Sequence, residues 1–117
     1  MKSLRITVLR AATLAAAAML VIPASAGAAD EAAARALARQ SNCFKCHAVD
    51  KKKEGPSFKD TAAKYAGKAD AQARVVKHIT SGLKVKFEDG HEEEHTIVKS
   101  KDDKEIKNLV DWILSVK

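Results

Sequence analysis

The sequence predicts an all-α fold of about four helices. The clearest evidence is the C-terminal segment, where apolar residues recur at helical spacing and define one buried face: Ile106, Leu109, Val110, Ile113 and Leu114. No segment shows the alternating apolar and polar pattern that would predict a strand with confidence. The chain has 117 residues and only two cysteines, so it has room for one small domain and no network of disulfides.

The first 26 residues are predicted to be a cleaved signal peptide. Lys2, Arg5 and Arg10 precede an apolar stretch at 11–22, and Ala24-Ser25-Ala26 forms an A-x-A cleavage site. The stretch is shorter than the roughly 20 apolar residues of a membrane-spanning helix. Cleavage would leave residues 27–117 as one domain and lower the formal charge from +6 to +3, because it removes three cations. The mature protein would then lie in the periplasm and would not span the membrane.

Capping residues and glycines predict where the helices begin and end. Acids at Asp30 and Glu31 start a first helix that ends near Asn42. A lysine-rich loop at 50–56 closes with Gly55-Pro56, and a short helix follows from Phe58 to Ala66, with Gly67 as its stop. Another helix runs from Asp70 to Gly82, and Ser100 with Asp103, or Asp102 with Glu105, caps the last.

Between these last two helices, residues 83–100 lack helical periodicity. The segment contains Phe87, Asp89-Gly90 and two histidines, so we expect a functional loop.

Cys43-Phe44-Lys45-Cys46-His47 is a C-x-x-C-H motif, and it uses both cysteines of the chain. Two thiols at this spacing can form thioethers to the vinyl groups of a haem, while the adjacent histidine ligates the iron. A disulfide between Cys43 and Cys46 is the alternative, but it would constrain little of the chain and leave His47 without a role. The motif therefore predicts one covalently attached haem c, which would also complete the small apolar core.

These features together resemble the small class I cytochromes c of bacteria. The resemblance extends over the motif, Gly55-Pro56-Ser57-Phe58, Lys64-Tyr65-Ala66-Gly67 and the tail with Trp112. It implies a class I cytochrome c fold in which the first and last helices cross. It also implies that His47 is the proximal ligand, that the Pro56 carbonyl accepts the other N–H of that ring, and that Trp112 packs near a haem propionate.

The chain departs from the family at the sixth ligand of the iron, which is usually a methionine. Met1 and Met19 are its only methionines, and both lie in the predicted signal peptide. His95 falls within about one residue of the family's methionine, counted back from Trp112, and is the leading distal candidate. His91, an open site, or a lysine such as Lys84 or Lys86 are the alternatives. A second histidine in place of methionine would lower the reduction potential.

Two other histidine patterns receive plainer interpretations. His91-Glu92-x-x-His95 matches the H-E-x-x-H zinc-protease motif, which works only on a helix, and no helix is expected there. His78, between Lys77 and Ile79, is predicted to be a solvated surface histidine.

The expected function is the transfer of single electrons between redox partner proteins, without enzymatic activity. Lysines around the motif can favour acidic partners at the docking face: Lys45, Lys51, Lys52, Lys53, Lys59 and Lys64. Export and the modest charge argue against nucleic acid. The alternative is a haem-based gas-binding or sensing protein whose distal histidine is displaceable.

Overall fold

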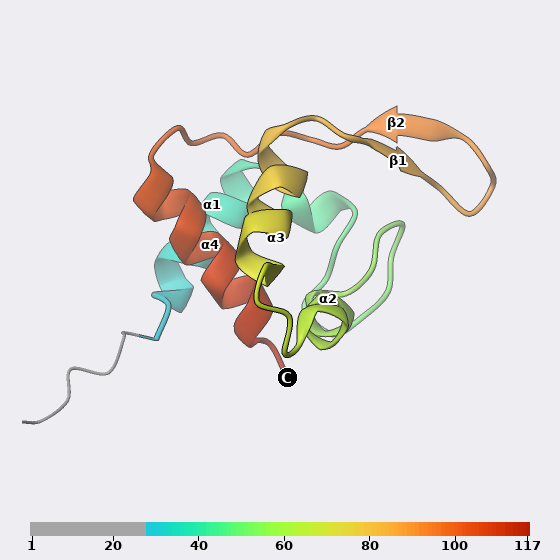
Figure 1. Ribbon diagram of the computed structural model, residues 1–117. Coiled ribbons are helices and arrows are strands. Elements are labelled where there is room, and N and C mark those ends of the chain that lie inside the picture. Colours follow the sequence, from blue (N-terminus) through green and yellow to red (C-terminus); the bar gives the residue numbers. More distant parts are fainter. Residues whose placement is uncertain (1–27) are drawn as a thin grey trace, which may run out of the picture.

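The computed structural model describes residues 28–117, and the predicted signal peptide lies outside the described residues. Figure 1 shows a bundle of helices with a small hairpin projecting from it. The elements are α1 (Glu31–Gln40), the 3-10 turn η1 (Cys43–Lys45), α2 (Phe58–Tyr65), α3 (Ala71–Thr80), β1 (Lys84–Lys86), β2 (Glu92–Glu94) and α4 (Asp103–Ser115). The expectation of a mainly helical domain with about four helices is confirmed. In the described part of the chain, none of the helices has the length and apolarity needed to cross a membrane.

The core forms where α4 crosses α1 (Figure 1). Leu109 and Val110 of α4 are completely buried, as is Ala38 of α1, and Ala34 is nearly so. Ala34 and Ala38 are four residues apart and share one helix face. Their small side chains allow α1 to pack closely against the apolar stripe of α4.

The start of α1 is fixed by side-chain hydrogen bonds. The Asp30 carboxylate caps the helix by accepting a bond from the Ala33 N–H at 3.0 Å. The Asn108 amide of α4 exchanges two bonds with the backbone of Asp30, at 2.8 and 2.9 Å. A local cap and a contact across 78 positions of sequence therefore hold the same residue.

Helices α2 and α3 begin and end close to the predicted positions. Ser57 caps α2 by accepting a hydrogen bond from the Asp60 N–H at 3.0 Å, and Gly67 follows α2 with a positive φ of 74°. The two helices pack into the common core through Phe58 of α2 and through Val75 and Ile79 of α3.

The segment expected to be a loop instead contains an antiparallel hairpin. Lys84 pairs with Glu94 and Lys86 with Glu92, so opposite charges face each other across the two strands. The turn contains Asp89-Gly90, a typical hairpin sequence, with Gly90 at a φ of 92°. This hairpin corrects the expectation of a loop, in a chain where no strand was predicted with confidence.

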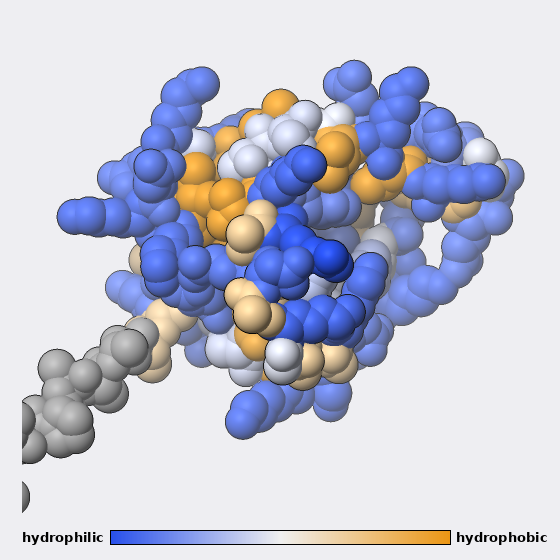
Figure 2. Space-filling model, in the orientation of Figure 1, coloured by the Kyte–Doolittle hydropathy of each residue, from blue (hydrophilic) through white to orange (hydrophobic). Residues whose placement is uncertain are grey.

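The hairpin is joined to the helices at its base. The His95 N–H donates to the Leu83 carbonyl and the Val98 N–H to the Ile79 carbonyl, each at 2.8 Å. Val98 is buried, and the Lys99 N–H donates to the buried Ser41 hydroxyl at 2.9 Å. The face shown in Figure 2 is mainly hydrophilic and is hollowed below the hairpin.

Candidate haem site

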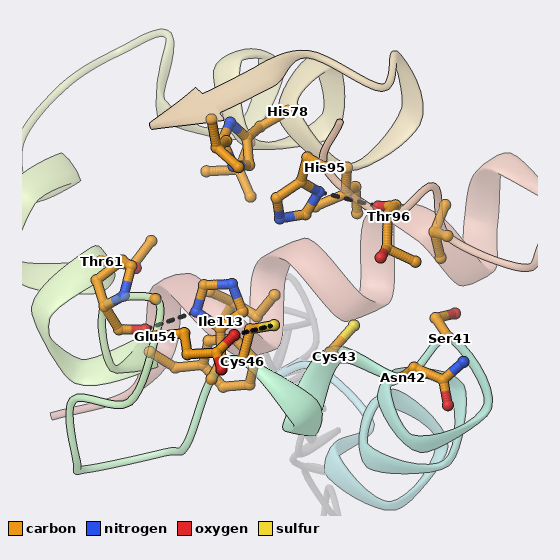
Figure 3. Close-up of a pocket in the computed structure, with 18 of the residues that line it drawn as sticks. Ser41, Asn42, Cys43, Cys46, Glu54, Thr61, His78, His95, Thr96 and Ile113 are labelled. Atoms are coloured by element: carbon orange, nitrogen blue, oxygen red, sulfur yellow. Dashed lines mark hydrogen bonds between the residues drawn. The ribbon is translucent and has the colours of Figure 1, made fainter. Parts of the chain in front are cut away.

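The two cysteines follow α1, after a sharp change of backbone direction at Asn42. Asn42 is the one non-glycine residue with a positive φ (60°) in the described part of the chain, and η1 begins immediately after it. Asparagine tolerates this left-handed conformation better than most residues. Cys43 and Cys46 are not joined by a disulfide, and burial raises the pKa of each thiol. In Figure 3 both lie on the same side of a cavity.

His47 is held by the loop that follows it. Its Nδ1 lies 2.6 Å from the carbonyl oxygen of Pro56, and its ring stacks on Phe58 with centroids 5.5 Å apart. Because a carbonyl can only accept, Nδ1 carries the proton and Nε2 keeps its lone pair. The resemblance implied this same contact with Pro56, and it prepares Nε2 to bind a metal.

Gly55 is required beside that ring. A Cβ at this position would lie 2.6 Å from His47 Cε1 and 2.9 Å from Nδ1, closer than atoms can pack. The Gly55 N–H also donates to the Cys46 carbonyl at 2.8 Å, which brings the loop back onto the motif. The glycine thus allows the backbone to reach the imidazole.

The cavity in front of His47 has a volume of about 530 Å³. Its wall combines the three motif residues with apolar side chains of several elements: Phe58, Val75, Ile79, Val85, Val98, Leu109 and Ile113. An apolar cavity with two thiols and an imidazole on one side suits a haem attached through the C-x-x-C-H motif. The residues present therefore fit the expected cofactor.

His95 lines the same cavity from the hairpin side. Its ring centroid lies 6.1 Å from that of His47, and its Nδ1 lies 2.9 Å from the Thr96 carbonyl oxygen. Nδ1 therefore donates and Nε2 is again available. Burial lowers the pKa of His95, which favours the neutral form that ligates metals.

His91 lies at the hairpin tip and does not line the cavity. Its ring stacks on Phe87 with centroids 4.3 Å apart, and its two ring nitrogens face the carboxylates of Asp89 and Glu93. The hydrogen bond that this imidazole donates to the Asp89 carboxylate raises its pKa. Both ring nitrogens of His91 are therefore already engaged by carboxylates.

The prediction that His78 is a solvated surface residue is wrong. His78 is half-buried and lines the cavity beside His95, with ring centroids 4.3 Å apart (Figure 3). Burial, followed by the nearby His95, His47 and Lys64, lowers its pKa. The spacing contained a signal, because His78 is three residues after the buried Val75 and therefore shares its helix face.

Trp112 is buried in the core and is not among the cavity-lining residues. It packs edge-to-face on Phe58 at 5.5 Å, and the Arg35 guanidinium lies 5.0 Å from its ring. Its role beside a propionate stays a prediction. Trp112 instead links α4 to the residue that stacks on His47.

The H-E-x-x-H pattern does not form a zinc site in the described residues. Its central glutamates form β2, and its two histidines have the different surroundings given above. No group of three or more histidine, cysteine or acidic side chains that could hold a metal ion occurs in residues 28–117.

Comparisons with known proteins agree with this geometry. The sequence model of the Cytochrome c family matches residues 31–117. The crystal structure of the class 1 cytochrome MtoD from Sideroxydans lithotrophicus ES-1 is 61% identical, with a TM-score of 0.73, covering 76% of this chain and 98% of MtoD. Cytochrome c-552 of Nitrosomonas europaea is 38% identical over 81 residues, which are 69% of this chain and 76% of the relative. Cytochrome c-551 of Pseudomonas aeruginosa is 46% identical over 46 residues, and this match spans only 44% of its length.

Proposed function

The chain belongs to the cytochrome c family, whose members bind one covalently attached haem c through the motif formed here by Cys43, Cys46 and His47, and on that premise we propose that it is a periplasmic carrier of single electrons with His47 and His95 as the two axial ligands. The haem supplies the electron chemistry, and the protein supplies ligands, burial and a docking surface. Its named relatives are cytochromes c.

The observation that carries this proposal is the pair His47 and His95. Each ring has its Nδ1 bonded to a backbone carbonyl and its Nε2 available, as metal-bound histidines usually do. Two opposed imidazoles that each bind one metal through a bond of about 2 Å have ring centroids roughly 6 Å apart. The observed separation of 6.1 Å is close to that distance.

The other distal candidates fit less well. Both ring nitrogens of His91 face carboxylates at the hairpin tip. Lys84 and Lys86 lie exposed on β1, and although Lys86 borders the cavity, a lysine must lose its proton before it can bind iron. An open sixth position is disfavoured because His95 already faces the cavity.

This ligand pair favours a reduction potential below that of histidine–methionine relatives. A thioether raises the potential of a haem, so an imidazole in its place lowers it. Glu93 and Glu94 also line the cavity, and their negative charges stabilise ferric over ferrous iron.

The charge distribution supports an acidic redox partner. Lys45, Lys51 and Lys53 are exposed around the attachment motif, whereas the hairpin carries most of the nearby acids. An acidic surface would therefore be steered toward the motif and away from the hairpin.

The test compares the wild-type holo-protein with a His95→Met variant. We expect the variant to have a higher reduction potential, because its ligand set becomes that of the usual family member. We also expect reduced wild-type protein to bind carbon monoxide slowly or not at all. A potential that His95→Met leaves unchanged even when His78 is also replaced by alanine would remove His95 from the iron, and rapid carbon monoxide binding by the wild type would favour the gas-sensing alternative.

A further inference from the structure

A second imidazole, His78, lies on the distal side of the cavity. It is on α3, one position before the buried Ile79, and its ring centroid is 4.3 Å from that of His95. Figure 3 shows both rings on the side of the cavity opposite Cys43 and Cys46. One coordination position on that side therefore has two histidines next to it.

The ring nitrogens of His78 have no hydrogen-bond partner among the described residues. The other three histidines each have one or more, from Pro56, from Thr96, or from Asp89 and Glu93. A half-buried imidazole is normally satisfied by a protein group or water. Both nitrogens of His78 thus remain available to a group bound in the cavity.

Different elements carry the two distal histidines. His78 lies in the last turns of a ten-residue helix whose Val75 and Ile79 are buried in the core. His95 follows the three-residue strand β2, whose residues are all exposed. A short hairpin alone is marginally stable in water, so His95 can leave the cavity with the hairpin while α3 keeps His78 in place.

We propose that His78 is a reserve distal ligand that takes the sixth coordination position of the haem iron when His95 leaves it. The exchange breaks one iron–nitrogen bond and forms another, so it needs no oxidant or reductant. It rests on the proposed function because it assumes that His95 is the resting ligand. Its consequence is that movement of the hairpin does not open the iron to external ligands.

The experiment compares four holo-proteins by optical and electron paramagnetic resonance spectroscopy: wild type, His95→Ala, His78→Ala and the double variant. We expect His95→Ala to keep a low-spin, six-coordinate ferric iron. The double variant should become high-spin, and His78→Ala alone should resemble the wild type. His91→Ala is the matched control and should change nothing.

Titration with added imidazole gives a second measurement. An internal ligand acts at an effective concentration of mM or more. His95→Ala should therefore need at least about ten-fold more imidazole than the double variant for half-saturation. Haem content and circular dichroism of each variant establish that it is folded and loaded.

The outcomes separate the two proposals. A high-spin His95→Ala protein that binds imidazole as readily as the double variant overturns the reserve role and leaves His95 as the ligand. A high-spin His78→Ala protein, with His95→Ala unchanged, overturns the assignment of His95 itself.

Discussion

The two sides of the haem cavity are built in different ways. On the His47 side, the Gly55, Phe58 and Lys59 N–H groups donate to the carbonyls of Cys46, Ala48 and Val49 at 2.8 to 2.9 Å, and Phe58 is buried in the core. On the His95 side, an exposed hairpin bonds largely to itself and reaches the helices at its base. His47 is thus fixed by the backbone of the core, whereas His95, the distal ligand in our proposal, is presented by a segment attached at a few points.

If His95 is the distal ligand as proposed, this difference explains how residues 27–117, which contain no methionine, keep the fold. The distal segment contributes Val98 to the core but few other buried side chains. Its sequence is therefore less constrained by packing, and the identity of the sixth ligand can change while the proximal side stays the same.

The largest effect should come from the proximal side, through Gly55→Ala. The added methyl group collides with the His47 ring, and overpacking of this kind costs about 2–3 kcal/mol. We expect the free energy of unfolding of the holo-protein to fall by that amount, with reduced haem content. Denaturant titration followed at the haem absorbance measures it.

Gly90→Ala, at the hairpin tip, is the control for this change. A Cβ there meets nothing within 4 Å, although the φ of 92° makes alanine strained, at a cost of about 1 kcal/mol. Haem content should stay normal. Equal losses in the two variants, with normal haem content in both, would contradict a proximal side fixed more firmly than the distal one.

A smaller effect is expected at the base of the hairpin, from Val98→Ala. Removing buried methyl groups there should cost about 1–2 kcal/mol. Amide hydrogen exchange should speed up in the hairpin before it does in α4. Ile97→Ala is the neighbouring control, because its side chain is 53% exposed and its loss should stay within about 0.5 kcal/mol. Uniform acceleration across α4 and the hairpin would show that the distal segment does not open by itself.

The ion pair between Lys52 and Glu88 links the loop of the motif to the hairpin tip. Both side chains are mostly exposed, and solvent screening leaves such pairs a small contribution to stability. Lys52→Ala should therefore change the free energy of unfolding slightly at low salt and not at all at high salt. Lys51→Ala, which removes a neighbouring exposed lysine, is the control variant for the same measurement. A large loss that persists in high salt would mean that this pair anchors the hairpin.

The smallest effect is the response of the hairpin to pH. Asp89 raises the pKa of His91, so protonated His91 stabilises the hairpin most below its unfolded pKa, near 6.5. That stabilisation is lost as the pH rises through the raised folded value. Protection factors of the Phe87 and Gly90 amides should fall over this range, and should not do so in His91→Gln.

Much of the helical fold could be predicted because its signals are local. Asp30 caps α1, Gly67 ends α2, and the apolar stripe of α4 is continuous in sequence. The hairpin could not be predicted from the sequence, because β1 and β2 are dominated by charged residues without apolar alternation. Their pairing depends on cross-strand charges that become neighbours only after folding.

The haem site likewise combines residues that the sequence predicts with residues that only the folded structure brings together. Cys43, Cys46 and His47 are adjacent in sequence, so their joint chemistry could be predicted directly. His78 and His95 are 17 positions apart, and only the packing of α3 beside the hairpin brings their rings together. Which histidine faces the cavity is decided by tertiary contacts such as the bond between Val98 and Ile79.

The central claim is that His47 and His95 both ligate the haem iron. Nuclear magnetic resonance of the oxidised holo-protein, with ¹⁵N-labelled histidine, tests it most directly, because an iron-bound imidazole has strongly shifted ring signals. We predict two such imidazoles, with the signals of His95 replaced by those of His78 in His95→Ala and no second set in the double variant that also lacks His78. A single shifted imidazole, or a second set that disappears in His91→Ala instead, would contradict the claim.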